Sequence, residues 1–307
     1  MGDMTNSEPT SWGDLTFRGD RDSGIHDLLA DDQNNPWLTL GIMEKIDDEN
    51  LLNAWDTFLD VQTKMLGARE ISWLRVNGMG GGQAGILEIG SANGNYGSYL
   101  ARNFPNKQIY GLEANPNLAS LMDVDKCPDN YGIEICKVGD EPLPERISGK
   151  FDQCLLRFVL YHVSDPVRLL RAVYDSLPSG GKLYIIEEDD AFLTSQPKWG
   201  PMEIAFDIWR RVTLAGGSNS KIGRYLPGFV TKAGFKIDAF DITLRNNVEA
   251  GQEFYDLVNN MMKVFRLTNP KIVSEAEVEE ITDGLSSPSR HQNLATYPQF
   301  LLAATKE

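Results

Sequence analysis

A glycine-rich stretch that follows an acid is the part of the sequence best suited to binding a ligand. Residues 86–94 begin as a short apolar strand that carries Glu88 and continue as a loop with Gly90 and Gly94. Glycines in a loop between a strand and a helix let backbone N–H groups approach a ligand closely. In an open α/β sheet such a ligand lies outside the carboxyl ends of the strands. We therefore expect a binding site at this loop.

Acidic side chains follow the next two predicted strands. Glu113 ends the second strand, where a carboxylate can accept hydrogen bonds from both hydroxyls of a ribose. Asp140 follows the third strand, a position from which a side chain can recognise an adenine amino group, and the neighbouring Glu141 could take its place. Two acids and a glycine loop at the ends of three successive strands predict an adenosine-binding cleft.

The elements around these residues alternate between strand and helix. The apolar runs that predict strands are 86–89, 108–112, 132–138, 151–159, 182–187, 235–244 and 300–304. Helices are predicted between them, for example over 165–177, where Pro166 suits the first turn and Gly180 follows the end. Because such alternation requires crossover connections, we expect a parallel sheet that is covered by helices on both faces.

The sequence resembles the class I S-adenosylmethionine-dependent methyltransferases, in particular the small-molecule branch that includes the ubiquinone and menaquinone methyltransferases. Glu88, Gly90 and Gly94 match the first motif of that family, an acid followed by a glycine-rich loop. Ala92 stands where the family usually has glycine, so the loop is narrower by one methyl group. Glu113 matches the acid that binds the ribose.

Segments further along the chain match the same family. Asp140 matches the acid on the adenine side, residues 160–166 match the motif at the fourth strand, and residues 177–183 match the motif after the following helix. Residues 222–235 resemble a segment common in natural-product methyltransferases. The similarity covers roughly residues 86–244 and the final strand, and it leaves out the first 80 or so residues and the insertion over 192–220.

The resemblance implies a doubly wound, Rossmann-like α/β fold with a seven-stranded, mostly parallel sheet whose last strand is antiparallel. It implies an enzyme that transfers a methyl group from S-adenosylmethionine to a small molecule and releases S-adenosylhomocysteine. The residues expected to contact this cofactor are Glu88, Gly90, Ala92, Gly94, Glu113, Ala114, Asp140, Glu141 and Arg157. No metal is expected, since no cluster of histidines and acids has the spacing of metal ligands.

One histidine is placed to take part in the reaction. His162 follows the fourth strand and is the candidate proton acceptor by residue type. It could equally pack behind the strand and hydrogen-bond to the backbone. Methyl transfer needs a base only if the acceptor must lose a proton, so the sequence leaves both roles open.

Other functions remain compatible with parts of this pattern. The loop from Ala92 to Gly97 fits a dinucleotide fingerprint that lacks its first glycine, which would suit a nicotinamide oxidoreductase, but Glu88 and Gly90 favour S-adenosylmethionine. An enzyme of the same fold that catalyses a cyclisation or rearrangement, and a non-catalytic binding subunit, are the two further alternatives.

The chain is expected to have three parts. Residues 1–35 form a flexible arm, residues 36–82 a helical extension, and residues 83–307 the methyltransferase domain, with a lid insertion over 191–221. Within the extension, one helix is predicted from 48 to 66 and a second near 71–76. Aromatic residues of the extension and the insertion are expected to line an apolar lid over the acceptor, with plain core packing as the alternative: Trp55, Phe58, Phe192, Trp199, Phe206 and Trp209.

The amino-acid composition limits the classes of partner that the protein is expected to bind. The net charge of −15 and the pI near 4.7 disfavour nucleic acid and anionic membrane surfaces, because an acidic surface repels phosphate. No apolar run is long enough to span a membrane, no secretory signal is visible, and three cysteines fit a reducing, cytoplasmic setting. We expect the protein to act on a small apolar or aromatic, secondary-metabolite-like compound, as a monomer or a homodimer.

Overall fold

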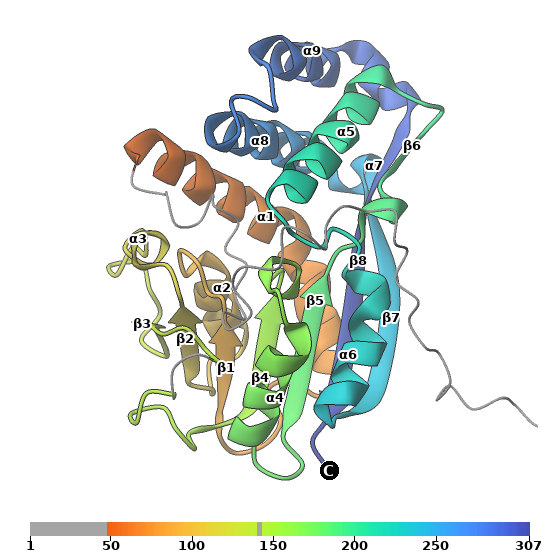
Figure 1. Cartoon of the computed structure of the whole chain (residues 1–307). Coiled ribbons are helices and arrows are strands. Elements are labelled where there is room, and N and C mark those ends of the chain that lie inside the picture. Colours follow the sequence, from red (N-terminus) through yellow and green to blue (C-terminus); the bar gives the residue numbers. More distant parts are fainter. Residues whose placement is uncertain (1–47, 140–142) are drawn as a thin grey trace, which may run out of the picture. The chain divides into compact units, whose positions relative to one another are not determined.

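The computed structural model describes residues 48–139 and 143–307 (Figure 1). The predicted arm over residues 1–35, the first part of the predicted helical extension, and the candidate acids Asp140 and Glu141 lie outside the described residues.

A twisted sheet forms the centre of the described region. Its main strands run in the order β3-β2-β1-β4-β5-β8-β7, with the first five parallel and β8 antiparallel to both β5 and β7. Their bounds are β1 Gly85–Ile89, β2 Ile109–Glu113, β3 Tyr131–Ile135, β4 Phe151–Arg157, β5 Lys182–Glu187, β7 Lys236–Asn246 and β8 Leu294–Thr305. The predicted fold class is confirmed, including the antiparallel last strand.

One short strand was not predicted. β6, Thr194–Gln196, pairs with the start of β8 and makes the described sheet eight-stranded. Its polar sequence carries no alternation of apolar residues, so only the partner strand reveals it.

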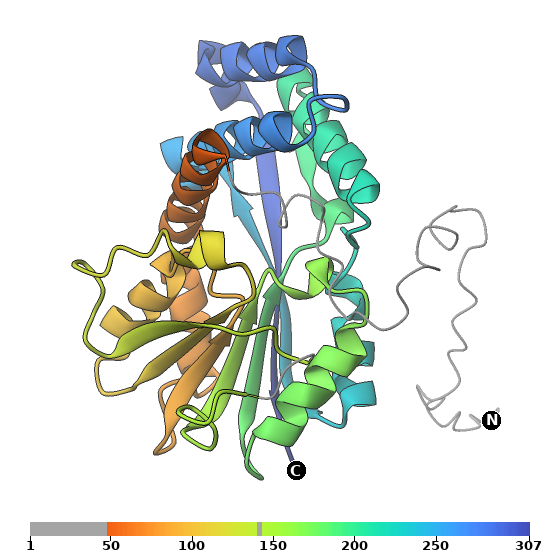
Figure 2. The ribbon, with the colours of Figure 1, turned by 60° about the vertical axis from the view of Figure 1, so that its left-hand side comes forward.

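Helices cover both faces of the sheet, as Figure 2 shows. α2 (Asn95–Asn103) packs on one face and α4 (Pro166–Ser176) and α6 (Leu226–Ala233) on the other. β5 explains why both faces need cover, because Leu183 and Ile185 belong to one buried cluster and Tyr184 and Ile186 to another. Strands buried on both faces are typical of parallel sheets.

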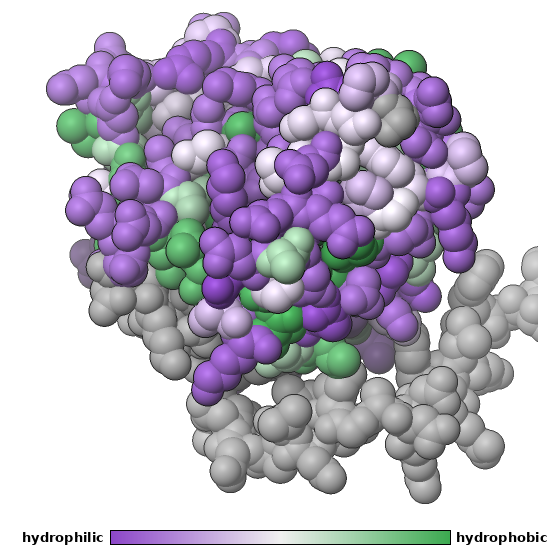
Figure 3. All heavy atoms as spheres, turned by 90° about the horizontal axis from the view of Figure 1, so that it is seen from above, coloured by the Kyte–Doolittle hydropathy of each residue, from purple (hydrophilic) through white to green (hydrophobic). Residues whose placement is uncertain are grey.

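A second group of helices gathers above one end of the sheet (Figures 1 and 2). We call it the helical cap. It consists of α1 Glu49–Val76, α5 Gly200–Ala215, α8 Gln252–Thr268 and α9 Glu275–Ser286. Seen from above, the cap presents mainly hydrophilic side chains to solvent (Figure 3), whereas its helices share one buried apolar cluster. Burial of that cluster holds the cap together.

Short helices complete the description. They are α3 Pro116–Ala119, η3 Leu160–His162, η4 Asp190–Phe192, η5 Gly223–Tyr225, α7 Asn247–Ala250 and η6 Pro288–Gln292. The helix over 165–177 and the capping box formed by Ser274 and Glu277 at the start of α9 are present as expected. No helix among the described residues is long and apolar enough to cross a membrane.

α1 corrects one expectation, because it is a single 28-residue helix rather than two. Asp48 caps its start by accepting hydrogen bonds from the backbone N–H groups of Asn50 and Leu51. A glycine inside a helix usually weakens it, but Gly67 is a point of close packing in α1. A Cβ at Gly67 would lie 2.8 Å from Cε1 of Tyr99. The helix therefore continues without a break and packs against α8 and α2.

Candidate active site

A cavity of about 420 Å³ lies beneath α1, at the carboxyl ends of β1, β2 and β4. Of the predicted site residues it brings together Glu88, Gly90, Ala92, Glu113, Ala114, Arg157 and His162. The other lining residues are Trp55, Phe58, Leu59, Gln62, Thr63, Ser91, Asn93, Tyr96, Asn115, Pro116, Asn117, Leu118, Lys137, Phe158, Val159 and Tyr161. Gly94 does not line the cavity; it precedes α2 at a φ of 76°.

The glycine loop passes close to the end of β4. Gly90 has a φ of 74°, and a Cβ there would lie 2.6 Å from Cγ2 of Val159, so only glycine fits. Ala92 also adopts the left-handed region, with a φ of 48°, which is strained for a residue with a side chain. Asn93 ties the loop to α1, since its Nδ2 donates to Oδ1 of Asp56 at 2.7 Å. The loop and the cap are therefore directly joined.

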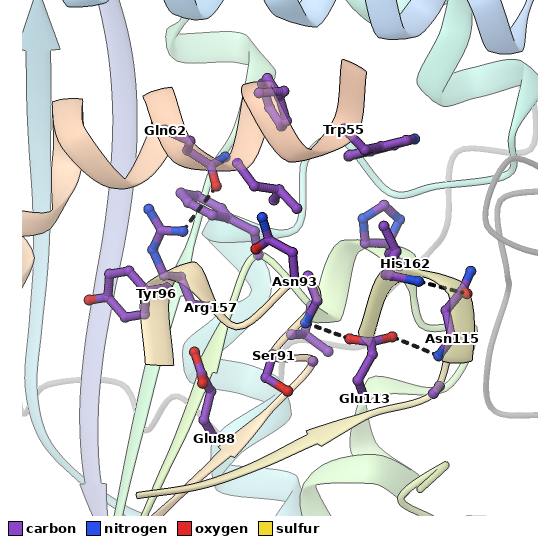
Figure 4. Close-up of a pocket in the computed structure, with 18 of the residues that line it drawn as sticks. Trp55, Gln62, Glu88, Ser91, Asn93, Tyr96, Glu113, Asn115, Arg157 and His162 are labelled. Atoms are coloured by element: carbon purple, nitrogen blue, oxygen red, sulfur yellow. Dashed lines mark hydrogen bonds between the residues drawn. The ribbon is translucent and has the colours of Figure 1, made fainter. Parts of the chain in front are cut away.

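Glu113 is held in place by backbone donors on both of its oxygens (Figure 4). The N–H of Ala92 donates to Oε2 at 2.7 Å, and that of Asn115 donates to Oε1 at 2.8 Å. Burial raises the pKa of Glu113, and these backbone hydrogen bonds oppose that rise. The N–H of Ala114 is a third backbone donor, so of the four acceptor positions of the carboxylate at least one remains for a ligand.

Arg157 lies at the other side of the loop, where Gln62 and Glu70 of α1 meet it. Its Nε donates to Oε2 of Glu70 and its Nη1 to Oε1 of Gln62, both at 2.9 Å. The guanidinium carbon lies 4.1 Å from the centre of the Tyr96 ring. Within the part of the chain that is described, Nη2 is buried and has no hydrogen-bond partner. An Arg donor of this kind suits a carboxylate of a ligand.

Sequence reasoning missed Gln62 and Glu70, although both are buried and polar. Glu70 also accepts a hydrogen bond from Nε2 of Gln299 at 2.6 Å, so α1, β4 and β8 share one polar cluster. Their only sequence signal is two polar residues on the inner face of a helix, which is too common to identify a site.

Glu88 lies under the loop, where its carboxyl is almost fully buried. Burial raises its pKa to about 7, opposed by the positive charge of Arg157 and by a hydrogen bond from the Tyr131 hydroxyl. The pKa therefore lies near neutrality, which makes the charge at this end of the cavity dependent on a nearby cation.

His162 lies in η3, where its imidazole projects toward Trp55 (Figure 4). Its ring centre is 3.6 Å from that of Tyr161, and among the described residues its buried Nδ1 has no hydrogen-bond partner. Burial lowers the pKa of His162 to about 3. The imidazole is therefore neutral at physiological pH and retains a proton poorly.

A run of four acids is typical of a solvated loop, but Glu187, which ends β5, and the following Glu188, Asp189 and Asp190 are all buried. Glu187 accepts hydrogen bonds from the backbone N–H groups of Val159 and Leu160 and so fixes the start of η3. Glu188 accepts a short hydrogen bond from the hydroxyl of Tyr297, and its pKa is raised to about 8, chiefly by burial.

Asp189 and Asp190 each have a basic partner. Nε and Nη2 of Arg224 donate to Oδ2 and Oδ1 of Asp189 at 2.7 and 2.5 Å. Oδ2 of Asp190 lies 3.8 Å from Nε of Arg210. Together the four acids set the backbone of the loops that surround the cavity.

Aromatic side chains form the remaining wall of the cavity. Trp55 and Phe58 of α1 and Tyr161 of η3 line it and also line a smaller pocket that Trp209, Met261, Val264 and Phe265 complete. Of the predicted lid aromatics, Trp209 thus reaches a pocket, while Trp199 and Phe206 are core residues of the cap and Phe192 is 40% exposed. No group of potential metal ligands occurs among residues 48–139 and 143–307.

Comparisons with known proteins point to one family. Residues 87–183 match the family model described as a methyltransferase domain. The tRNA U34 carboxymethyltransferase of Campylobacter fetus subsp. fetus is 31% identical over 118 residues, which cover 36% of this chain and 40% of that protein. Methyltransferase str2 of Strobilurus tenacellus is 28% identical over 141 residues, which cover 41% of this chain and 49% of that protein. The chain therefore aligns with less than half the length of these curated relatives.

A solved structure supports the fold. A phosphoethanolamine N-methyltransferase of Haemonchus contortus, in complex with phosphomonomethylethanolamine and S-adenosylhomocysteine, superposes with a TM-score of 0.53 at 16% identity. The match covers 86% of this chain and 59% of that one. The chain thus has the fold of this methyltransferase, and its residues 87–183 match the family model of a methyltransferase domain.

Proposed function

We propose that the protein transfers a methyl group from S-adenosylmethionine to a small-molecule acceptor. The observation that carries the proposal is that Glu113 and Arg157 line different sides of one cavity, at the carboxyl ends of the parallel strands. A carboxylate for the ribose and an unpartnered guanidinium N–H for a carboxylate complement the two polar ends of that cofactor.

The residues present fit the cofactor. Glu113 would accept a hydrogen bond from the ribose at an acceptor position that its backbone donors leave open. The buried Nη2 of Arg157 would bind the carboxylate of the methionine part. Gly90 lets the loop backbone approach, and Glu88, Ala92 and Ala114 line the same region. Gly94, Asp140 and Glu141 remain predictions, the last two for the adenine side.

The chemistry supplied by the cofactor is a methyl group already activated on a sulfonium. The protein then has to align the acceptor and exclude water. α1 does both, because it covers the cavity with Trp55, Phe58 and Gln62 and is fastened to the loop through Asp56. His162 would contact the acceptor as a neutral hydrogen-bonding group, since its low pKa makes it a weak base.

Several observations favour a small, apolar or aromatic acceptor. The wall opposite the polar end is aromatic, and the net charge of −15 opposes binding of a nucleic acid. One relative is named as an enzyme of tRNA, but it aligns with only 36% of this chain. The cap helices α5, α8 and α9 lie beyond residues 87–183, which match the family model.

Methyl transfer can be tested with S-adenosylmethionine that carries a tritiated methyl group. The protein is incubated with this cofactor and a fractionated extract of small molecules, and S-adenosylhomocysteine is measured alongside labelled product. We expect one S-adenosylhomocysteine for each labelled product. An unlabelled product that mass spectrometry detects without release of S-adenosylhomocysteine would indicate a cyclisation or rearrangement instead. Tritium recovered in added tRNA, and not in small molecules, would contradict the proposed acceptor class.

A further inference from the structure

Gln62 and Glu70 are two polar side chains on the inner face of α1, the helix that covers the cavity. Gln62 is 5% exposed and Glu70 is fully buried, and both accept a hydrogen bond from the guanidinium of Arg157. Burying a polar side chain costs free energy unless hydrogen bonds compensate for the lost contacts with water. The question for each side chain is therefore which of its polar atoms have a partner.

Both carboxylate oxygens of Glu70 have partners within the protein. Oε2 accepts from Nε of Arg157 at 2.9 Å, and Oε1 accepts from Nε2 of Gln299 at 2.6 Å. Glu70 does not line the cavity. It therefore fastens α1 to β4 and β8 and leaves no acceptor directed at a ligand.

Gln62, in contrast, has a partner at only one end of its amide. Oε1 accepts from Nη1 of Arg157 at 2.9 Å. A guanidinium has donors and no acceptor, so the amide must present its oxygen to Arg157 and turn Nε2 away from it, as Figure 4 shows. Within residues 48–139 and 143–307, Nε2 makes no hydrogen bond, yet it is not among the enclosed atoms that lack a partner. Because Gln62 lines the cavity, these two N–H donors are open to it.

The position of this amide indicates which group of the cofactor it can bind. Gln62 lies at the Arg157 end of the cavity, opposite the ribose-binding Glu113 of the proposed function. The methionine part of S-adenosylmethionine carries an ammonium, a sulfonium and a carboxylate, and only the carboxylate accepts hydrogen bonds. Hydrogen bonds to an ionised acceptor are also stronger than those to a neutral one. A free amide N–H at this end therefore suits the carboxylate.

We propose that Gln62 is a cofactor-binding residue whose amide N–H groups donate to the carboxylate of the methionine part of S-adenosylmethionine. The inference rests on the proposed function, since it concerns the same cavity and the same cofactor. α1 lies outside residues 87–183, which match the family model, so the helix adds a donor to the cofactor site from outside the matched region. The hydrogen bond from Arg157 holds the amide in the required orientation.

The test is a calorimetric titration of two ligands that differ in the methionine part. S-adenosylhomocysteine carries the carboxylate, whereas 5′-methylthioadenosine has a methyl group in place of the whole amino-acid chain. Gln62→Glu is the informative variant, because one oxygen can still accept from Arg157 while the other replaces the N–H donors. We expect it to bind S-adenosylhomocysteine at least about tenfold more weakly than the wild type, with unchanged affinity for 5′-methylthioadenosine.

Two further variants complete the experiment. Gln62→Met removes the donors without adding a charge and should weaken S-adenosylhomocysteine binding at least about fivefold, again without effect on 5′-methylthioadenosine. It decides the question if thermal unfolding shows that Gln62→Glu is not folded. Gln252→Glu is the matched control, since Gln252 is an exposed glutamine at the start of α8 that does not line the cavity. This variant should bind both ligands as the wild type does.

The possible failures are distinguishable. Unchanged affinity of folded Gln62→Glu for S-adenosylhomocysteine would overturn the inference, because it would show that Gln62 only supports Arg157. An equal loss for both ligands, or tighter binding of S-adenosylhomocysteine, would overturn it as well. Each of these results leaves the proposed function intact, since the wild type binds S-adenosylhomocysteine in all of them. If the wild type binds neither ligand, the proposed function fails and the inference fails with it.

Discussion

The two ends of the cavity differ in chemistry and in their place in the chain. The polar end is built from the loop after β1, Glu113 and Arg157, and it lies within the residues that match the methyltransferase family model. The aromatic end is built from Trp55 and Phe58 of α1 together with residues of α5 and α8. All of these lie outside the residues that match the family model. Tyr161 lies within that match and lines both the cavity and the smaller pocket.

The two ends therefore differ in how they are built: apart from Gln62, the polar end belongs to the matched methyltransferase domain, and the aromatic end is particular to this chain. Hydrogen bonds to backbone and between charged groups fix the polar end, as at Glu113 and Arg157. The aromatic end is shaped by packing, and the indole N–H groups of Trp55 and Trp209 have no hydrogen-bond partner among the described residues. We infer that the first end serves the cofactor and the second selects the acceptor, so variants at the two ends should affect different measurements.

The largest effect is expected for Arg157→Met at the polar end. It leaves Glu70 buried without its cationic partner, which costs about 3 kcal/mol of unfolding free energy. The double variant Arg157→Met/Glu70→Gln removes both charges and should regain most of that stability. Its affinity for S-adenosylhomocysteine should stay at least about tenfold below that of the wild type. Normal affinity of the stable double variant would show that Arg157 serves structure alone.

Two buried carboxyls, one near each end, should respond differently to pH. Their pKa values of about 7 for Glu88 and about 8 for Glu188 exceed the ordinary 4.5 of a glutamate. Such a carboxyl contributes its full stability below pH 4.5 and loses it as pH rises through the raised pKa. Glutamine does not titrate, so Glu188→Gln should become more stable than the wild type by about 3 kcal/mol near pH 7.5.

The measurement is urea unfolding of both variants between pH 4.5 and 8.5. The gain of Glu88→Gln over the wild type should level off near pH 7, and that of Glu188→Gln near pH 8. A gain that does not change with pH in either variant would mean that the corresponding carboxyl is ionised throughout.

His162→Gln should have a moderate effect on methyl transfer. Because burial lowers the pKa of His162 to about 3, the imidazole orients the acceptor and does not remove its proton. With an acceptor identified by the labelled-methyl assay, kcat should fall less than about tenfold, and the pH profile should be unchanged. A loss of about a hundredfold or more, together with the disappearance of a limb near pH 6.5, would identify a general base.

The smallest effect is expected for Ala92→Gly. Glycine relieves the strain of the left-handed backbone at φ 48°, which should stabilise the protein by up to about 1 kcal/mol. The gain in thermal unfolding should come without a change of more than about threefold in S-adenosylhomocysteine affinity. A clear loss of affinity would show that the Ala92 methyl group contacts the cofactor.

The polar end could be predicted from the sequence because local rules fix it. Glu113 and the residues 86–94 lie at strand ends, and the order of strands decides that those ends meet. The seven main strands were predicted because most of them are short apolar runs, and β7 alternates between apolar and polar residues. Glu88, Gly90, Ala92 and Ala114 then follow their strands into the cavity.

The aromatic end could not be predicted in this way. Trp209 of α5 lines a pocket, whereas Trp199, which caps the start of the same helix, is a core residue. Helical spacing in the sequence does not distinguish these two roles. The acids after β5 looked solvated because their partners, Arg224, Tyr297 and the N–H groups of η3, are distant in sequence. Such contacts depend on tertiary packing, which local patterns do not encode.

Binding of S-adenosylmethionine at the polar end can be measured by calorimetric titration of that cofactor. The wild type is compared with Glu113→Ala and with Glu134→Ala, a glutamate on β3 that pairs with Arg146 and does not line the cavity. We predict saturable binding to the wild type, at least about tenfold weaker binding to Glu113→Ala, and unchanged binding to Glu134→Ala. Equal affinity of the wild type and Glu113→Ala, or no binding to the wild type, would contradict the account.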